Sequence, residues 1–424
     1  MNNEFDVVIV GGGAAGVGAA RRLAGSGLST LLLEADLRLG GRAWTREIAG
    51  LPLDLGCGWL HSADRNALAA LAEEAGIALD KRRAAWGTQF RDLGFAAKER
   101  ADASREFGGW MHRLEEVQAA SDRASDALDP QGDWNTYIQN IVNFISGGPL
   151  EQMSAADYLN YDEASTESNW RAAKGLGALI AGSFPNRVAL RLATPVQSLE
   201  LSAPGTVLTT PMGVVRARAT ILTVSTAVLT GDDLKLPAAL DAWRDAARAL
   251  PLGRNEKMFM EIIGEAPFEN ETQVLGNPRA PNTASYYIRP LGMPVIECFF
   301  GGEGARMVET ADLSAASAFA LEQLGALFGE SIRRSLRPRV ISSWSRNTWV
   351  GGAYSYALPG QVGARQRLAQ SFEQRVFFAG EATSRGEFST AHGAYGSGVR
   401  AANEAIEALL PRRGRQSAGF TGGA

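Results

Sequence analysis

The sequence has few of the residues that build disulfide frameworks or metal sites. Only two cysteines, Cys57 and Cys298, occur among 424 residues. That number excludes a disulfide scaffold and fits a reducing compartment, so we expect a cytoplasmic protein. The three histidines, His61, His112 and His392, are scattered and lack the spacing of metal ligands, so we expect no metal site.

Long apolar runs and an excess of charge of one sign are also missing. No run of about 18 apolar residues occurs, so we expect no membrane span. The formal net charge is -4, which does not favour binding to nucleic acid or to an anionic membrane. Hydrophobic residues make up 45% and charged residues 21%, the composition of an ordinary globular protein. At about 150 residues per domain, the length allows two or three domains.

The chain begins with a pattern of strand, turn and helix. Residues 6–10 form a continuous apolar run typical of a buried parallel strand, residues 14–25 predict a helix, and residues 30–33 predict a second strand. The intervening residues 11–16 are rich in glycine and therefore lie on the turn between the first strand and the helix.

Three glycines of this turn have the spacing Gly-x-Gly-x-x-Gly. Gly11 permits the tight turn, Gly13 lets a pyrophosphate approach the backbone, and Gly16 lets the helix pack close to the sheet. The helix N-terminus supplies N–H donors and a partial positive charge. Glu34 follows Gly11 by 23 residues, and a carboxylate there can accept hydrogen bonds from both ribose hydroxyls. The motif predicts a dinucleotide site.

The character of the sequence changes several times further along. Charged amphipathic segments such as residues 99–128 and 134–145 replace the strand patterns, which return after residue 187 and again after residue 256. We therefore expect an α/β nucleotide-binding domain and an α+β second domain, a mixed sheet with helices, interleaved along the chain. The first domain takes residues 1–80, 171–242 and 359–410, the second takes residues 81–170 and 243–358, and residues 411–424 are expected to be a disordered tail.

Three further motifs follow the glycine turn: residues 39–43 (LGGRA), residues 54–61 (DLGCGWLH) and residues 376–383 (VFFAGEAT). With that turn and in this order, they resemble the flavin-containing amine oxidase family, which includes monoamine oxidases, polyamine oxidases and relatives that demethylate histones. The resemblance covers roughly residues 5–409. It implies a Rossmann-like FAD-binding domain interleaved with a substrate-binding domain.

The resemblance also implies which residues bind FAD. Arg42 would lie near the pyrophosphate and flavin, where its charge offsets that of the phosphates. Val196 would lie in a strand against the adenine, and a helix starting near residue 392 would point its N-terminus at the flavin, which favours the anionic reduced form. The predicted cofactor residues are Gly11, Gly13, Ala15, Gly16, Glu34, Ala35, Gly41, Arg42, Gly56, Gly58, Trp59, Val196, Trp349, Gly380, Glu381, Thr390 and Ala391.

One departure from the family bears on how the cofactor is held. In the covalent monoamine oxidases a cysteine lies in the stretch that corresponds to residues 351–354. Here that place is Ala353, and neither Cys57 nor Cys298 lies in an equivalent position. The resemblance therefore predicts that FAD is bound non-covalently.

Four residues are implied at the reacting face of the flavin. Lys257 would hold a water against flavin N5, where a cation favours the charge that develops on oxygen. Tyr354 would line the path of the amine, and Thr390 replaces a second tyrosine of monoamine oxidases in a stretch that resembles polyamine oxidases. His61 ends a Gly-x-x-Trp-x-His string similar to that of animal-type polyamine oxidases. With a pKa near about 6.5 it could accept a hydrogen bond from the substrate amine.

The implied activity is the oxidation of a polyamine or of another primary or secondary amine. A hydride would pass from the carbon beside nitrogen to flavin N5, with O2 as acceptor, and the imine would hydrolyse to an aldehyde with release of H2O2. An alkylammonium, with a pKa near about 10.4, has no free lone pair, so the site must favour the neutral amine by desolvation and aromatic walls. The expected partners are a small amine and O2, and the protein could be a monomer or a homodimer.

Two alternatives stay open. An L-amino-acid oxidase of the same superfamily would need an arginine for the substrate carboxylate, and Arg82, Arg83 and Arg91 lie in the second domain where such a group could come from. A flavin-binding protein without turnover is the alternative from another class. A carotenoid- or porphyrinogen-type oxidase is disfavoured by Lys257 and His61.

Overall fold

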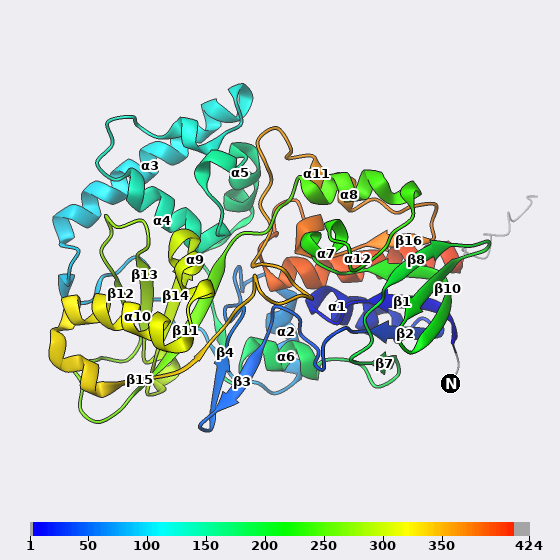
Figure 1. Cartoon of the computed structure of the whole chain (residues 1–424), viewed down its shortest axis with the longest axis horizontal. Coiled ribbons are helices and arrows are strands. Elements are labelled where there is room, and N and C mark those ends of the chain that lie inside the picture. The colour runs from blue at the N-terminus through cyan, green and yellow to red at the C-terminus, as the bar shows by residue number, and fades with distance from the viewer. Residues whose placement is uncertain (1–2, 411–424) are drawn as a thin grey trace, which may run out of the picture.

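The computed structural model describes residues 3–410. Residues 411–424, which the sequence predicts to be a disordered tail, lie outside the described residues. Figure 1 shows two lobes, one built around a seven-stranded sheet and the other around a five-stranded sheet and a group of helices. The fold is therefore of the mixed α/β type that the sequence predicts.

The seven-stranded sheet is parallel at its centre. β1 pairs in parallel with both β2 and β10, β2 pairs in parallel with β7, and β10 pairs in parallel with β16. β9 joins β10 in antiparallel fashion, and β8 extends that edge. The strands are β1 (Glu4–Val10), β2 (Thr30–Leu33), β7 (Ala189–Arg191), β8 (Ser198–Leu201), β9 (Thr206–Thr210), β10 (Gly213–Leu222) and β16 (Val376–Phe378).

Helices cover both faces of this sheet, which explains why its central strands are continuous apolar runs. Along β1, Val7 and Ile9 pack in the cluster that contains residues of α1 (Ala14–Leu23) and α12 (Ala391–Leu409). Val8 and Val10 point to the opposite cluster, beside α7, α8 and α11. This alternation is the two-residue period of a strand. The covering helices on that side are α7 (Thr226–Thr230), α8 (Asp241–Arg248) and α11 (Ala364–Leu368).

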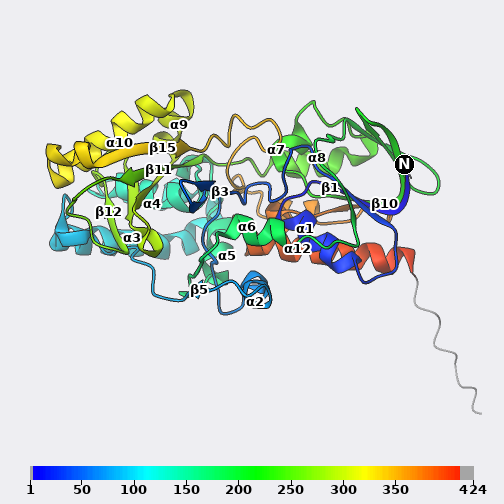
Figure 2. The same cartoon turned by 90° about the horizontal axis from the view of Figure 1, so that it is seen from below.

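Helices α1 and α12 lie side by side against the sheet, as Figure 2 shows. Their backbones come so close that a Cβ added at Gly398 would stand 1.9 Å from the carbonyl oxygen of Ala15. Glycine at this position therefore permits the contact between the first and the last helix of the described chain.

The five-stranded sheet of the other lobe is antiparallel, in the order β12-β13-β14-β11-β15. One of its faces packs on α9 (Gly302–Thr310) and α10 (Leu313–Phe328) through an apolar cluster that includes Met258 and Cys298. The strands are β11 (Asn255–Ile262), β12 (Thr272–Leu275), β13 (Ala284–Ile288), β14 (Val295–Gly301) and β15 (Leu336–Ile341). The opposite face carries polar and aromatic side chains and forms a wall of the site described below.

A group of helices completes this lobe. α3 (Ala97–Ala120), α4 (Asn135–Ser146) and α5 (Ala155–Ala164) share an apolar cluster around Trp110 and Tyr158. Shorter elements connect the lobes: the hairpin β3 (Thr45–Ile48) and β4 (Leu51–Asp54), the pair β5 (Leu79–Asp80) and β6 (Arg171–Ala172), and the helices α2 (Ala67–Glu74) and α6 (Leu176–Gly182).

The structure corrects several sequence-based expectations. The predicted amphipathic segment of residues 99–128 is α-helical only to Ala120, because the chain then turns at Asp122, which has a positive φ of 53°, and a short 3-10 helix, Ala124–Ala127, follows. Val196, expected in a strand, lies two residues before β8. Strand β15 was not predicted, since its sequence LRPRVI contains a proline and two arginines and it forms an edge of its sheet. The domain boundaries proposed from the sequence stay a prediction.

Across residues 3–410, no helix combines the length and the apolar composition needed to cross a membrane.

We predict that Gly398→Ala destabilises the protein by about 1–3 kcal/mol, because the new methyl group forces apart two packed helices. Gly396→Ala, on the same helix, is the matched control: its Cβ would meet no described atom within 4 Å, so it should be neutral or stabilising by up to about 1 kcal/mol. Urea unfolding followed by circular dichroism measures both changes. Equal effects of the two variants would contradict the close packing of α1 and α12.

Candidate active site

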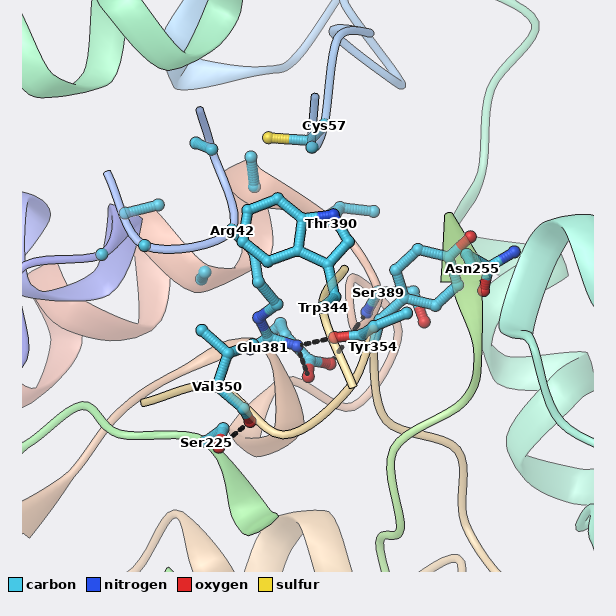
Figure 3. Close-up of a pocket in the computed structure, with 18 of the residues that line it drawn as sticks. Arg42, Cys57, Ser225, Asn255, Trp344, Val350, Tyr354, Glu381, Ser389 and Thr390 are labelled. Carbon is cyan, nitrogen blue, oxygen red and sulfur yellow. Dashed lines mark hydrogen bonds and ion pairs between the residues drawn. The ribbon is translucent and has the colours of Figure 1, made fainter. Parts of the chain in front are cut away.

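One cavity of about 1050 Å³ receives residues from both lobes. All the predicted site residues except Gly16 line it, although they come from segments up to about 380 residues apart in sequence. Figure 3 shows part of its wall, with Trp344 near the centre of the view and Arg42, Tyr354 and Thr390 drawn around it. The volume exceeds the range of about 300–1000 Å³ of ordinary small-molecule pockets, so the cavity is large enough for a cofactor and a substrate together.

The glycine turn forms one end of this cavity. Gly16 faces away from it, and a Cβ there would stand 1.9 Å from the carbonyl oxygen of Gly11, so its glycine permits helix packing. Gly13 does line the cavity, and the atoms nearest to an added Cβ are 3.9 Å away. Gly13 is also the N-cap of α1, which has no side-chain cap among the described residues. The first N–H groups of α1 are therefore available to phosphate oxygens.

Glu34 lies beside the turn and is buried. Its carboxylate accepts hydrogen bonds from the backbone N–H groups of Gly12 and Asp36, the latter at 2.7 Å. Burial raises the pKa of Glu34 above its ordinary value, although these two hydrogen bonds oppose the shift. Ala35 and Val196 line the cavity next to it. The arrangement suits a ribose with a neighbouring flat ring.

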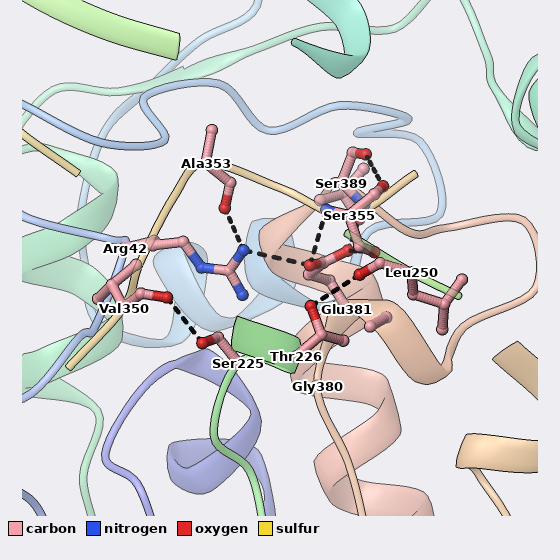
Figure 4. Close-up of polar contacts among 12 residues, drawn as sticks. Arg42, Ser225, Thr226, Leu250, Val350, Ala353, Ser355, Gly380, Glu381 and Ser389 are labelled. Atoms are coloured by element: carbon pink, nitrogen blue, oxygen red, sulfur yellow. Dashed lines mark hydrogen bonds and ion pairs between the residues drawn. The ribbon is translucent and has the colours of Figure 1, made fainter. Parts of the chain in front are cut away.

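Arg42 and Glu381 form an ion pair at the cavity wall, with Nη1 and Oε1 3.1 Å apart (Figure 4). Arg42 also donates to the carbonyl of Ala353. Glu381 accepts from the backbone N–H of Ser355 at 3.1 Å, from its hydroxyl at 2.7 Å and from the N–H of Ser389 at 3.0 Å. Burial would raise the pKa of Glu381, but neighbouring arginines hold it below the ordinary value. Glu381 thus stays ionised and joins three loops.

A second buried pair supports the first and was not predicted from the sequence. Arg365 is 1% exposed and donates to both carboxylate oxygens of Asp157, at 2.6 and 2.7 Å. It also donates to the hydroxyl of Ser355 at 2.9 Å. Asp157 belongs to α5 in one lobe and Arg365 to α11 in the other. The pair therefore ties the two lobes together directly behind Glu381.

Four tryptophans line the cavity, Trp59, Trp86, Trp344 and Trp349, and the best buried of them, Trp344, was not predicted from the sequence. Trp349 is 41% exposed, whereas Trp344 is 6% exposed. The indole N–H of Trp344 donates to the carbonyl of Leu55 at 3.1 Å, and its backbone N–H donates to Glu256 at 2.6 Å. Trp344 is thus fixed at both ends. The sequence offered no signal to prefer it, because the two residues lie five positions apart in one loop.

No cysteine occupies position 353, but Cys57 does line the cavity (Figure 3). Burial, with the neighbouring Asp54 carboxylate, raises the pKa of the Cys57 thiol to about 12. The thiol is therefore protonated at neutral pH, and a protonated thiol is a poor nucleophile. Cys298 is in the apolar core between β14 and the helices.

The other end of the cavity is built on the five-stranded sheet. Lys257 pairs with Phe299, and Phe259 pairs with Glu297, across β11 and β14. Because side chains alternate, this register places Lys257, Glu297 and Phe299 on the face opposite the apolar cluster. All three line the cavity, together with Tyr287 of β13.

Lys257 is 7% exposed and is held by two oxygens. Its ammonium lies 2.9 Å from Oε1 of Glu297 and 3.5 Å from the carbonyl oxygen of Asp54. Burial would raise the pKa of Glu297, but the charges of Lys257 and Arg171 hold it below its ordinary value. Arg171 approaches the other oxygen of Glu297 at 3.5 Å. Neither Glu297 nor Arg171 was predicted from the sequence.

Asp54 lies next to Lys257 and belongs to the same cluster of charged residues. Its carboxylate accepts from the hydroxyl of Thr45 and from the backbone N–H groups of Leu176 at 2.9 Å and Gly177 at 3.2 Å, at the start of α6. Burial raises its pKa, and those hydrogen bonds together with the Lys257 charge oppose the shift. Gly58 lies between the two, since a Cβ there would stand 3.4 Å from the Lys257 ammonium and 3.4 Å from the Asp54 carboxylate.

His61 lies in the cavity wall next to Trp86, with ring centroids 5.6 Å apart. Its Nδ1 is 2.7 Å from the side-chain oxygen of Asn169, so Nδ1 carries the proton and Nε2 is free to accept one. Burial lowers the pKa of His61 below its ordinary value, which leaves the ring neutral at pH 7. The sequence predicted His61 and missed Asn169, because the loop that carries Asn169 has no motif.

Tyr354 and Thr390 both line the cavity, but their hydroxyls are already hydrogen-bonded. Tyr354 donates to the carbonyl of Phe144 at 2.8 Å, and burial raises its pKa, so the phenol stays neutral. Thr390 is the N-cap of α12: its hydroxyl accepts from the N–H of Gly393 at 3.0 Å and donates to Glu387 at 2.6 Å. These residues can shape the cavity, but they offer no free hydroxyl to a substrate.

The three arginines considered for a substrate carboxylate do not line the cavity. Arg82, Arg83 and Arg91 have side chains that are 63%, 91% and 61% exposed, and each lies near a carboxylate outside the cavity, except that Glu167, the partner of Arg83, also touches its rim. Within residues 3–410, no group of three or more His, Cys, Asp and Glu side chains is arranged to hold a metal ion.

The comparisons with known proteins point to one family. A model of the family of flavin-containing amine oxidoreductases matches residues 14–94 and 79–406. The chain is 28% identical to polyamine oxidase 4 of Oryza sativa subsp. japonica, over 96% of this chain and 90% of that protein. It is 26% identical to polyamine oxidase 2 of Arabidopsis thaliana, over 96% and 89%.

Two further matches are a relative about twice as long as this chain and a solved structure. Lysine-specific histone demethylase 2 of Homo sapiens is 25% identical over 94% of this chain, which spans only 53% of that protein. A solved structure of a putrescine oxidase double mutant superposes with a TM-score of 0.73 at 18% identity, covering 95% of this chain and 99% of that one. That likeness shows a shared fold.

We predict that Glu297→Gln lowers the free energy of unfolding by about 3–5 kcal/mol at pH 7, because it leaves two buried cations without their carboxylate. The matched control is Glu269→Gln, which removes an exposed ion pair with Arg91 and should cost less than about 1 kcal/mol. Urea unfolding at several pH values measures both.

The same experiment has a defined pH dependence. The pKa of Glu297 is lowered in the folded state, so its stabilising contribution is present above the ordinary pKa of about 4.3 and is lost as pH falls through the lower folded-state value. The difference between the wild type and Glu297→Gln should therefore shrink in acid. A difference that grows as pH falls would contradict the ion pair.

Proposed function

Because the chain belongs to the family of flavin-containing amine oxidoreductases, we propose that it oxidises a polyamine or another primary or secondary amine in the cavity between its two lobes. The hydride leaves the carbon beside the amine nitrogen, and O2 is the final acceptor, so that an imine, then an aldehyde, and hydrogen peroxide result. The observation that carries the proposal is the position of Lys257, buried at the far end of the same cavity that begins at the glycine turn.

The chain is a flavin amine oxidase, and its cofactor is FAD. The cavity fits that group in the chemistry of its donors. The uncapped N-terminus of α1 and Arg42 would hold the pyrophosphate, and Glu34 would hold a ribose. The segment 56–59 and Trp344 would hold the flavin ring. When bound, FAD supplies the hydride acceptor at N5 and the route for electrons to O2.

The cavity walls favour the neutral form of an amine. A hydride leaves readily only when the nitrogen lone pair is free, so the ammonium must lose its proton. Phe144, Tyr354 and Phe299 supply apolar and aromatic surface, and desolvation disfavours the charged amine. His61, neutral and with Nε2 unprotonated, is the base that can accept the amine proton or orient the nitrogen.

Lys257 acts in the second half of the cycle. Its ammonium is held by Glu297 and the Asp54 carbonyl and cannot turn away into solvent. A fixed cation beside the reacting oxygen stabilises negative charge as it develops. The side chain needs no proton transfer for this role.

The relatives support an amine as substrate without defining which one. The names of the relatives include polyamine and putrescine oxidases, whereas the alternative of an L-amino-acid oxidase loses the three arginines first considered for it. An anaerobic titration separates the hypotheses: the yellow protein should bleach with a substrate amine before any oxygen is added. A protein that binds FAD but is bleached by no member of a panel of polyamines, monoamines and amino acids would be a flavin-binding protein without turnover.

We predict that Lys257→Met slows the reaction of the reduced enzyme with O2 by about 100-fold, because the variant lacks the cation that stabilises charge on oxygen. Stopped-flow absorbance separates this step from anaerobic reduction by the amine, which should change less. Lys98→Met, at an exposed lysine on α3, is the control and should match the wild type. Equal slowing of both half-reactions would remove Lys257 from the proposed role.

We also predict that acid precipitation releases all the FAD into the supernatant, because position 353 is alanine and the Cys57 thiol stays protonated. Absorbance of the pellet and the supernatant measures the release. Yellow protein in the pellet would contradict non-covalent binding. Cys57→Ser would then identify whether that cysteine holds the flavin.

A further inference from the structure

Arg171 has an unusual environment for a buried arginine. It is 6% exposed, lines the cavity, and lies over two aromatic rings, with its guanidinium carbon 4.0 Å from the centre of Trp59 and 4.3 Å from that of Tyr287. These cation–π contacts hold the guanidinium against the two rings. They are contacts with rings and not hydrogen bonds to acceptor atoms.

The N–H groups of Arg171 have almost no partners in the protein. An arginine side chain carries five N–H donors, and none of them makes a hydrogen bond within residues 3–410, while Nη2 is itself shielded from solvent. The one charged contact is with Oε2 of Glu297 at 3.5 Å, longer than a good hydrogen bond. Unmet donors in a buried guanidinium are costly, so the geometry favours an acceptor that arrives from outside.

The carboxylates near Arg171 leave it without a close partner of its own. Lys257 and Arg171 share one carboxylate, and Lys257 holds it more closely, at 2.9 Å. The next carboxylate that acts on Arg171 is Asp80, and it is occupied by Arg82 through two hydrogen bonds of 2.8 Å. An anion that binds the remaining N–H groups of Arg171 therefore leaves the hydrogen bonds of Asp80 and the ion pair of Lys257 with Glu297 in place.

We propose that Arg171 binds a carboxylate of the substrate, so that the amine oxidised by this protein also carries an acid group. This inference rests on the proposed amine oxidation and names its substrate class. A carboxylate matches the planar fork of a guanidinium and can take two N–H groups at once. Since Arg171 and Lys257 stand at the two oxygens of Glu297, a short amino acid held by Arg171 has its amine end near Lys257. A second ammonium at that place, as in a diamine, is repelled.

Matched substrates test the proposal in the holoenzyme. γ-Aminobutyrate and putrescine differ in one end group, and leucine and isoamylamine differ by the carboxylate alone. Peroxide release gives kcat/KM for each. In the wild type, the acid of at least one pair should exceed its partner by about tenfold or more. In Arg171→Met that ratio should fall at least about tenfold, and in Arg171→Lys it should fall less, because charge remains without the planar fork. Arg83→Met, at an exposed arginine, should keep the wild-type ratio.

A binding measurement needs no turnover. Butyrate should perturb the visible spectrum of the wild-type holoenzyme and compete with the substrate, butyramide should not, and Arg171→Lys should weaken butyrate binding. The proposal is overturned if the wild type prefers the amine of both pairs, if butyrate and butyramide bind alike, or if Arg171→Met leaves the substrate ratio unchanged. If no substrate bleaches the flavin while butyrate still binds through Arg171, the proposed oxidation fails and the carboxylate site stands. If Arg171→Met does not fold, the wild type and Arg171→Lys still decide.

Discussion

The pairing register of β11 and β14 is the constraint on which the site depends. Met258 faces Cys298 on the side of the helices, so Lys257, Phe299 and Glu297 must face the cavity. A shift by one residue would bury the ammonium and the carboxylate in the apolar cluster and expose methionines to the cavity. The burial of that cluster therefore determines where the charged groups of the site lie. The alternation of side chains along β11 and β14 therefore determines both the packing of the apolar cluster and the position of the charged groups.

The cavity wall contains two buried networks of charged side chains with different roles. The one around Glu381 includes Arg42 and Ser355 (Figure 4). It continues through Arg365 to Asp157, which lie on helices of different lobes. All its charges have close partners, as buried ions require. The other runs from Lys257 through Glu297 to Arg171, where two cations share the Glu297 carboxylate and Lys257 is the closer of the two. The first network is complete without a ligand, whereas the second has donors to spare, and that contrast distinguishes a structural role from a binding role.

The sequence predicted those parts of the site whose geometry is local. The glycine turn, Glu34 and Arg42 lie within a few residues of a strand end or a turn, so the spacing of the turn and of Glu34, together with the family resemblance for Arg42, was enough to predict residues that line the cavity. The motif containing His61 and the strand containing Lys257 likewise enter the cavity. Val196 was placed correctly at the cavity but wrongly in a strand, because strand ends are not defined by composition.

The residues that could not be predicted from the sequence share one property: each one functions through contact with a residue far away in the chain. Arg171 and Glu297 are 126 positions apart, by their numbers, and meet only in the folded chain. Asn169 matters because it is hydrogen-bonded to His61. Arg365 matters because it is paired with Asp157, which lies 208 positions away in the sequence. An arginine before a glycine-rich turn, or a glutamate in a strand, is by itself an ordinary surface residue. Only tertiary structure shows that it is buried and which of its hydrogen bonds are missing.

The most direct test of the account is a crystal structure of the yellow holoenzyme. We predict that the flavin ring lies between Trp344 and the segment 56–59, with N5 joined to the Lys257 ammonium through one water at hydrogen-bond distances of about 2.7–3.2 Å. A flavin whose N5 faces away from Lys257, or whose ring lies outside the cavity, would contradict it.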